Sequence, residues 1–85
     1  MPQTVPTLTY DEPSDMLEWT WTGPDPDSWN IEQSPDGTTG WLVWDNISGT
    51  SSHVEPDDGF YYRVIGLSPA SSPVGPYSNV VFATG

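Results

Sequence analysis

The sequence predicts an all-β protein, a single domain over residues 1–85 that folds as a seven-stranded antiparallel β-sandwich. Short segments alternate apolar and polar side chains, and no helical periodicity of useful length is present. Turn-forming residues recur about every 8 to 12 residues, a spacing typical of antiparallel sandwiches. A chain of this length has room for one hydrophobic core and no second lobe.

The first two strands are predicted at 7–10 and 16–22. Prolines on both sides of the first segment are typical of an edge strand. In the second segment Leu17, Trp19 and Trp21 alternate with polar residues, so we expect these three side chains to face the core.

The third strand is predicted at 28–33, with Trp29 and Ile31 on its core face. Ser34-Pro35-Asp36-Gly37 follows as a tight turn, because proline presets φ and Asp-Gly tolerates the conformation that ends the turn.

The fourth strand is predicted at 41–44, followed by a loop over 45–50. Trp41 and Trp44 have opposite parity on this strand, so both can point inward only if the strand contains a bulge. We therefore expect one of the two indoles near the surface.

The remaining strands are predicted near 52–55, at 60–67 and at 79–83, with a loop rich in Pro, Ser and Gly over 68–77. The predicted core residues of this half are Val54, Phe60, Tyr62 and Val64.

Five segments carry a combined pattern over nearly the whole chain: Leu17-Glu18-Trp19-Thr20-Trp21, Gly23-Pro24, Trp29-Asn30-Ile31-Glu32-Gln33, the joint from Val54 to Val64, and Gly75-Pro76-Tyr77-Ser78-Asn79-Val80-Val81. Together they resemble a fibronectin type III domain. The resemblance implies an inward tryptophan on the second strand, here Trp21, and an inward aromatic at the start of the third, here Trp29.

The same resemblance implies a corner before the sixth strand, where a tyrosine hydroxyl bonds to nearby backbone. The family spacing maps onto Val54, Pro56 and Phe60, and Phe60 has no hydroxyl. Either the corner lacks that bond or the register shifts to Tyr62. We expect Phe60 in the corner, because Phe60, Tyr62, Val64 and Gly66 then share the core face.

The sixth strand also predicts an interaction surface. Its outward positions hold large side chains where a free-standing sandwich has polar ones, and the final strand is apolar on both faces. Such a patch usually marks a partner interface. The predicted interface residues are Tyr61, Arg63, Ile65, Leu67, Trp41, Trp44 and Val81, and Arg63 is expected to pair with Glu32 on the adjacent strand.

The charge balance excludes some partners. Twelve acidic residues face one basic residue, Arg63, which gives a net charge of -11. Nucleic acids and anionic membrane surfaces are repelled by this charge, whereas cations and basic partners are attracted. No apolar run is long enough to span a membrane, and Met1-Pro2-Gln3-Thr4 lacks the features of a secretory signal.

Metal binding and catalysis find little support in the sequence. Six carboxylates are expected in turns at one pole and make a candidate calcium site: Asp11, Glu12, Asp15, Asp36, Asp57 and Asp58. A solvated acidic cap is the simpler interpretation of the same residues. The chain has one histidine, His53, and no cysteine, and no serine lies in a nucleophile turn. We therefore predict no enzyme activity, no cofactor and no metal centre.

The expected function is that of a structural or interaction module. The chain begins with Met just before the first strand and ends just after the last, so we expect a complete module such as a small bacteriophage virion protein, a capsid decoration or cement protein or a tail accessory. Its partner would be a larger capsid or tail protein, and the loops around Asp25, Asn46 and Ser71 would face host surface glycans. The alternative is an extracellular spacer or glycan-binding module from a secreted multidomain bacterial enzyme.

Overall fold

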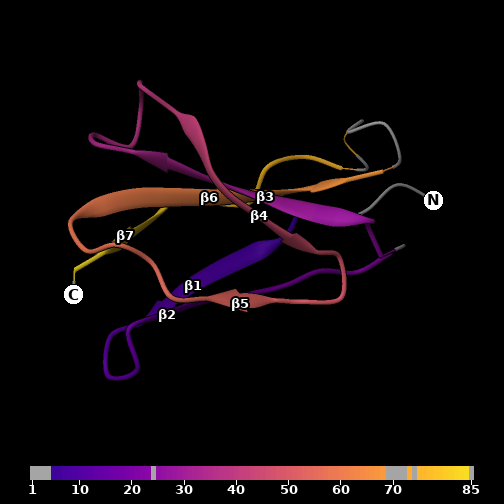
Figure 1. Ribbon diagram of the computed structural model, residues 1–85, viewed down its shortest axis with the longest axis horizontal. Helices are drawn as coiled ribbons and strands as arrows, with labels where there is room; N and C mark the ends of the chain where they lie inside the picture. The colour runs from indigo at the N-terminus through magenta and orange to yellow at the C-terminus, as the bar shows by residue number, and fades with distance from the viewer. Residues whose placement is uncertain (1–4, 24, 69–72, 74, 85) are drawn as a thin grey trace.

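The computed structural model describes residues 5–23, 25–68, 73 and 75–84, and these residues form two antiparallel sheets and no helix. One sheet has three strands in the order β1-β2-β5, and the other has four in the order β4-β3-β6-β7. Figure 1 shows the two sheets as two layers. The strands are β1 (Thr7–Asp11), β2 (Met16–Thr20), β3 (Ser28–Ser34), β4 (Leu42–Ser48), β5 (His53–Val54), β6 (Phe60–Leu67) and β7 (Val81–Ala83).

The alternation of apolar and polar residues located β1, β2, β3 and β6 closely, and the prediction for the fourth strand was wrong. That strand runs from Leu42 to Ser48, so the segment predicted as a loop continues the strand as far as Ser48. Asp45 and Asn46 are common turn residues, but here they pair with Ile31 and Asn30 of β3. Tertiary pairing has overridden their local preference.

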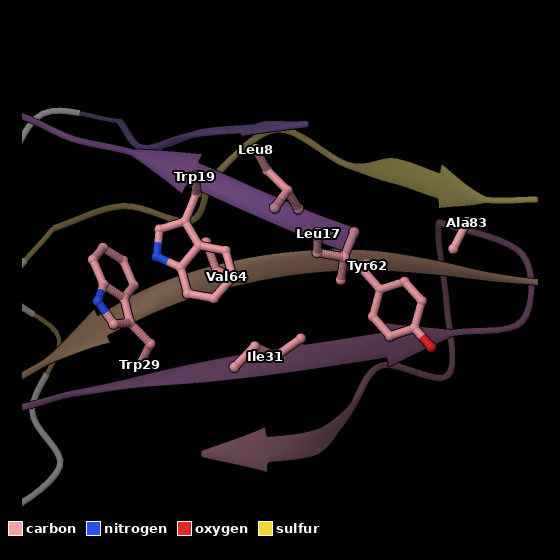
Figure 2. Packing of buried hydrophobic residues seen from close by; sticks show 8 residues of the cluster. All are labelled: Leu8, Leu17, Trp19, Trp29, Ile31, Tyr62, Val64 and Ala83. Carbon is pink, nitrogen blue, oxygen red and sulfur yellow. The ribbon is translucent and has the colours of Figure 1, made fainter. Parts of the chain in front are cut away.

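The core lies between the two sheets, and both contribute to it (Figure 2). Leu17 and Trp19 of β2 meet Trp29 and Ile31 of β3, and all four are buried. This confirms the predicted core faces of these strands. Trp21, Val54 and Phe60 are partly buried and pack against the same cluster, and Leu8 and Ala83 join it as fully buried residues that the sequence did not single out.

A bulge in β4 resolves the conflict between Trp41 and Trp44. The pairing of β3 with β4 shifts between Ile31 and Glu32, whose partners are Asp45 and Val43, so Trp44 is the extra residue. Trp44 packs against the core, with its ring 5.4 Å from that of Tyr62. The bulge thus turns Trp44, which the sequence placed among the interface residues, toward the core, where it is partly buried.

The corner before β6 uses Tyr62 rather than Phe60. The fully buried Tyr62 donates its hydroxyl to the backbone carbonyl of Asp57 at 2.9 Å and accepts a bond from the Gln33 amide at 2.9 Å. Phe60 lies at the start of β6 and is only partly buried. The sequence-based choice of Phe60 for the corner was wrong. Strand parity places Phe60 and Tyr62 on the same face, and only Tyr62 has the hydroxyl that makes the bond.

The substitution Tyr62→Phe is expected to lower the free energy of unfolding by about 1 to 2 kcal/mol, because the Asp57 carbonyl and the Gln33 amide each lose a partner while ring packing is kept. Urea denaturation monitored by tryptophan fluorescence measures this change. Phe60→Tyr is the matched control and should leave the midpoint nearly unchanged. Equal midpoints for Tyr62→Phe and wild type would contradict the corner bond.

Candidate functional site

The outer face of the four-stranded sheet carries the most unusual group of side chains in the described part of the chain. Trp29 and Ile31 point inward from β3. Because side chains alternate along a strand, Asn30 and Glu32 point outward. Glu32 pairs in register with Arg63 of β6. The alternation that builds the core thus places the only basic residue of the chain beside a carboxylate on the outer face.

Arg63 is held by an ion pair and by two aromatic rings. Its Nε and Nη2 donate to the same carboxylate oxygen of Glu32, Oε1, at 2.9 and 2.7 Å. Its guanidinium carbon lies 4.2 Å from the ring centroid of Trp41 and 3.8 Å from that of Tyr77. A cation over an aromatic face is attracted by the quadrupole of the ring. The expected pairing of Arg63 with Glu32 is confirmed.

Tyr77 closes this group from the chain segment before β7. Its hydroxyl donates to Oε2 of Glu32 at 2.9 Å, so both oxygens of that carboxylate have partners. Burial, followed by the bond to the Glu32 carboxylate, raises the pKa of Tyr77 above its ordinary value. We call Trp41, Arg63, Tyr77 and Glu32 the arginine stack.

A second aromatic pair lies on the same face, where β6 meets β7. Tyr61 and Phe82 are directly paired across the strands, and their rings are 4.7 Å apart. Phe82 is 41% exposed. With the arginine stack, and with the exposed Val43 and Val80, these rings give the outer face a large apolar component. Surfaces of this composition are typical of protein interfaces.

Two of the predicted interface residues are not available on this face. Ile65 and Leu67 have outward parity on β6, but each is only 6% exposed. The chain returns alongside this half of β6: Leu67 pairs with Pro73, and Ser78 bonds to both the backbone N–H and the carbonyl of Val64. The prediction of these two residues as interface was wrong because strand parity does not show this return.

Val81, which the sequence placed among the interface residues, pairs with Tyr62 and packs against the core, where it is partly buried. Its neighbour Phe82 takes the outward position. The sequence reasoning named neither Phe82 nor Tyr77 as a site residue. Phe82 could have been found from the alternation along the last strand, whereas no local signal indicates that Tyr77 reaches Arg63.

The structure places the three residues of the loops expected to face glycans differently. Asp25 is exposed in the loop after β2. Asn46 is not in a loop: it lies in β4, where its side-chain amide donates to Ser28 Oγ at 3.2 Å and to Asn30 Oδ1 at 2.8 Å. Ser71 lies outside the described residues.

The structure does not assemble the calcium candidate. Within the described ranges, no group of three or more His, Cys, Asp or Glu side chains is placed to hold a metal ion. Asp36 serves its own turn instead, where it accepts bonds from the hydroxyl and the N–H of Thr39 at 2.7 and 2.8 Å and from the N–H of Thr38 at 2.9 Å. These bonds, the Thr39 hydroxyl foremost, hold the pKa of Asp36 well below its ordinary value.

The pKa of Asp58, in the turn before β6, is shifted in the opposite direction from that of Asp36. Partial desolvation, followed by the neighbouring Asp15 carboxylate, raises the pKa of Asp58 above its ordinary value. Asp15 in turn accepts the hydroxyl of Tyr10 at 2.7 Å and has a left-handed backbone with φ of 55°. Protonation of Asp58 therefore relieves its repulsion from the neighbouring carboxylate.

No protein-family model, curated protein or solved structure matches the chain. The part of the chain that the structure describes contains no helix long and apolar enough to cross a membrane.

A double-mutant cycle tests the ion pair in the arginine stack. We expect Arg63→Met and Glu32→Gln to show a coupling free energy of about 1 to 2 kcal/mol, because the pair is partly buried and its bonds are charge-assisted. Urea denaturation of the wild type, both single variants and the double variant gives this energy. A coupling near zero would mean that the pair is no stronger than an exposed one.

The two aspartates are expected to respond to pH with opposite signs. The pKa of Asp36 is lowered by folding, so its contribution to stability is present above its unfolded pKa of about 4 and is lost as pH falls toward the folded value. Asp36→Asn should therefore lower the unfolding midpoint at pH 7, and the loss should shrink below pH of about 4.

The pKa of Asp58 is raised by folding, so the stability linked to its protonation is present at low pH and is lost as pH rises through the folded value. Asp58→Asn should raise the midpoint at pH 7 and have no effect below pH of about 4. Glu18→Gln removes one negative charge from the exposed face of β2 and is the control for the change of net charge. Shifts of the same sign in the Asp36 and Asp58 variants would contradict this account.

Proposed function

We propose that the protein is a non-enzymatic interaction module that docks on a larger protein through the outer face of its four-stranded sheet. The observation that carries this proposal is the combination of a fixed arginine stack with the Tyr61 and Phe82 pair on one exposed sheet face. The stack holds its rings in place before any partner binds, which reduces the entropy lost on association.

Charge indicates the kind of surface that fits this face. Arg63, the only basic residue, already has the Glu32 carboxylate as its partner. The remaining carboxylates leave the protein strongly anionic, so a partner with an apolar centre and basic residues around it is favoured, and a nucleic acid is disfavoured.

For the fold type we propose a fibronectin type III domain. Two features support it. The hydroxyl of Tyr62 bonds to the backbone five residues upstream, as the tyrosine corner requires. The fourth strand lies beside β3, whereas in constant-type immunoglobulin domains it joins the sheet of the first, second and fifth strands.

For the larger protein we propose a virion component, a capsid or tail protein, and the alternative is a neighbouring domain of a secreted bacterial enzyme. An interaction module that docks by one sheet face fits either setting. The identity of the protein recovered in the experiment below distinguishes them.

The substitution Phe82→Glu is expected to weaken docking at least about tenfold, because it places a charge at the centre of a desolvated contact. The partner is isolated on the immobilised wild-type chain, identified by mass spectrometry and purified, and its affinity is then measured by calorimetry. Thr9→Glu adds the same charge on the exposed face of β1 and is the matched control. A purified partner that binds the Phe82 and Thr9 variants equally well would contradict the proposal.

A further inference from the structure

A shallow depression lies at the end of β2, on a part of the surface that the proposed docking face does not use. Its lining includes Trp19, Thr20, Trp21, Gly23, Asp25 and Ser52. The aromatic part of the lining is Trp19 and Trp21, and the hydroxyls of Thr20 and Ser52 contribute polar atoms. We call it the Trp21 depression.

Two contacts fix the groups that face a ligand there. The ring of Trp21 packs against that of Trp29 with centroids 4.8 Å apart and planes at 62°, so the buried core supports it from below. Its Nε1 donates to Oδ1 of Asp25 at 3.2 Å, which orients the exposed carboxylate beside the indole. Trp21 itself is only partly buried. An aromatic ring and a carboxylate are therefore held side by side at the surface.

Among the residues that the structure describes, Asp25 has no ion-pair partner. The single basic residue, Arg63, is bonded to Glu32 on the outer face of the other sheet. An anionic ligand would be repelled by the net charge of -11, and a neutral ligand would gain nothing from it. A cationic group is attracted by the Asp25 carboxylate, by the face of the indole ring and by the negative electrostatic field of the whole protein.

We propose that the Trp21 depression binds an arginine or lysine side chain of a basic protein partner. The guanidinium or ammonium group lies against the Trp21 ring and pairs with Asp25, while the aliphatic stem covers apolar ring surface. This site is separate from the outer sheet face, so the two proposals stand or fall independently.

The test uses N-acetyl-arginine amide as a probe of the isolated side chain. Its addition to the ¹⁵N-labelled protein at low salt should shift the Trp21 indole N–H signal saturably, with a Kd of about 1 to 10 mM. The signal is assigned by its loss in Trp21→Phe. N-acetyl-citrulline amide, which has nearly the same shape without the charge, should produce no saturable shift.

The substitution Asp25→Asn keeps an oxygen for the Trp21 N–H and removes only the charge, so it should weaken binding about fivefold or more without unfolding the protein. Glu18→Gln makes the same change in net charge elsewhere and should leave binding nearly unchanged. Equal responses to the arginine and citrulline probes, or an unchanged affinity in Asp25→Asn, would overturn the proposal. A saturable shift with a neutral methyl glycoside and none with the arginine probe would also overturn it and would assign the depression to a sugar.

Discussion

The packing of the Trp19 and Trp21 indoles against Trp29 is the constraint on which the rest of the structure depends. Trp29 is fully buried in β3 and lies edge to face with both Trp19 and Trp21 of the other layer, at 5.7 and 4.8 Å. With no cysteine to link the sheets, apolar burial and aromatic contacts of this kind must hold them together. The Nε1 of Trp29 also donates to the carbonyl of Gly49 at 3.2 Å. A Cβ at Gly49 would lie 1.7 Å from the Pro26 carbonyl oxygen, so this position admits only glycine without backbone movement.

Placing Trp29 in the core determines what the surface presents. Because β3 alternates, an inward Trp29 and Ile31 require an outward Glu32, and the register with β6 then brings Arg63 to that carboxylate. The chain's single arginine is thereby used internally, held between Trp41 and Tyr77. At the end of β2 the same packing supports Trp21 beside the exposed carboxylate of Asp25. The core thus produces both an apolar sheet face and a separate anionic aromatic site.

The parts of the fold that could be predicted from the sequence are those in which side-chain parity follows an unbroken strand. Leu17, Trp19, Trp29 and Ile31 belong to such strands, and their inward orientation was predicted correctly. Parity failed at Trp44, where a bulge changes the face, and at Ile65 and Leu67, where a returning segment covers an outward surface. Parity also could not show whether Phe60 or Tyr62 forms the corner before β6, because both residues lie on the same face. They differ in a hydroxyl, and its acceptor is set by tertiary structure. Of the candidate site, the Arg63 and Glu32 pair followed from strand adjacency, whereas Tyr77 joins it from a segment with no strand pattern.

The edges of the two sheets explain why docking by a face fits this protein better than addition of a strand. At the β1 edge the side chain of Asn79 bonds to both the N–H and the carbonyl of Leu8, at 2.8 and 2.9 Å, and so occupies groups that an incoming strand would use. At the β4 edge the bulge at Trp44 interrupts the ladder, and Asp45 Oδ1 accepts the N–H of Asn46 at 2.8 Å. The edge strands β5 and β7 span only His53–Val54 and Val81–Ala83. Short, bulged or side-chain-capped edges resist pairing with other chains. The proposed docking partner is therefore expected to gain its free energy from side chains on a sheet face rather than from strand pairing. The outer face of the four-stranded sheet is where large exposed rings are held in fixed positions.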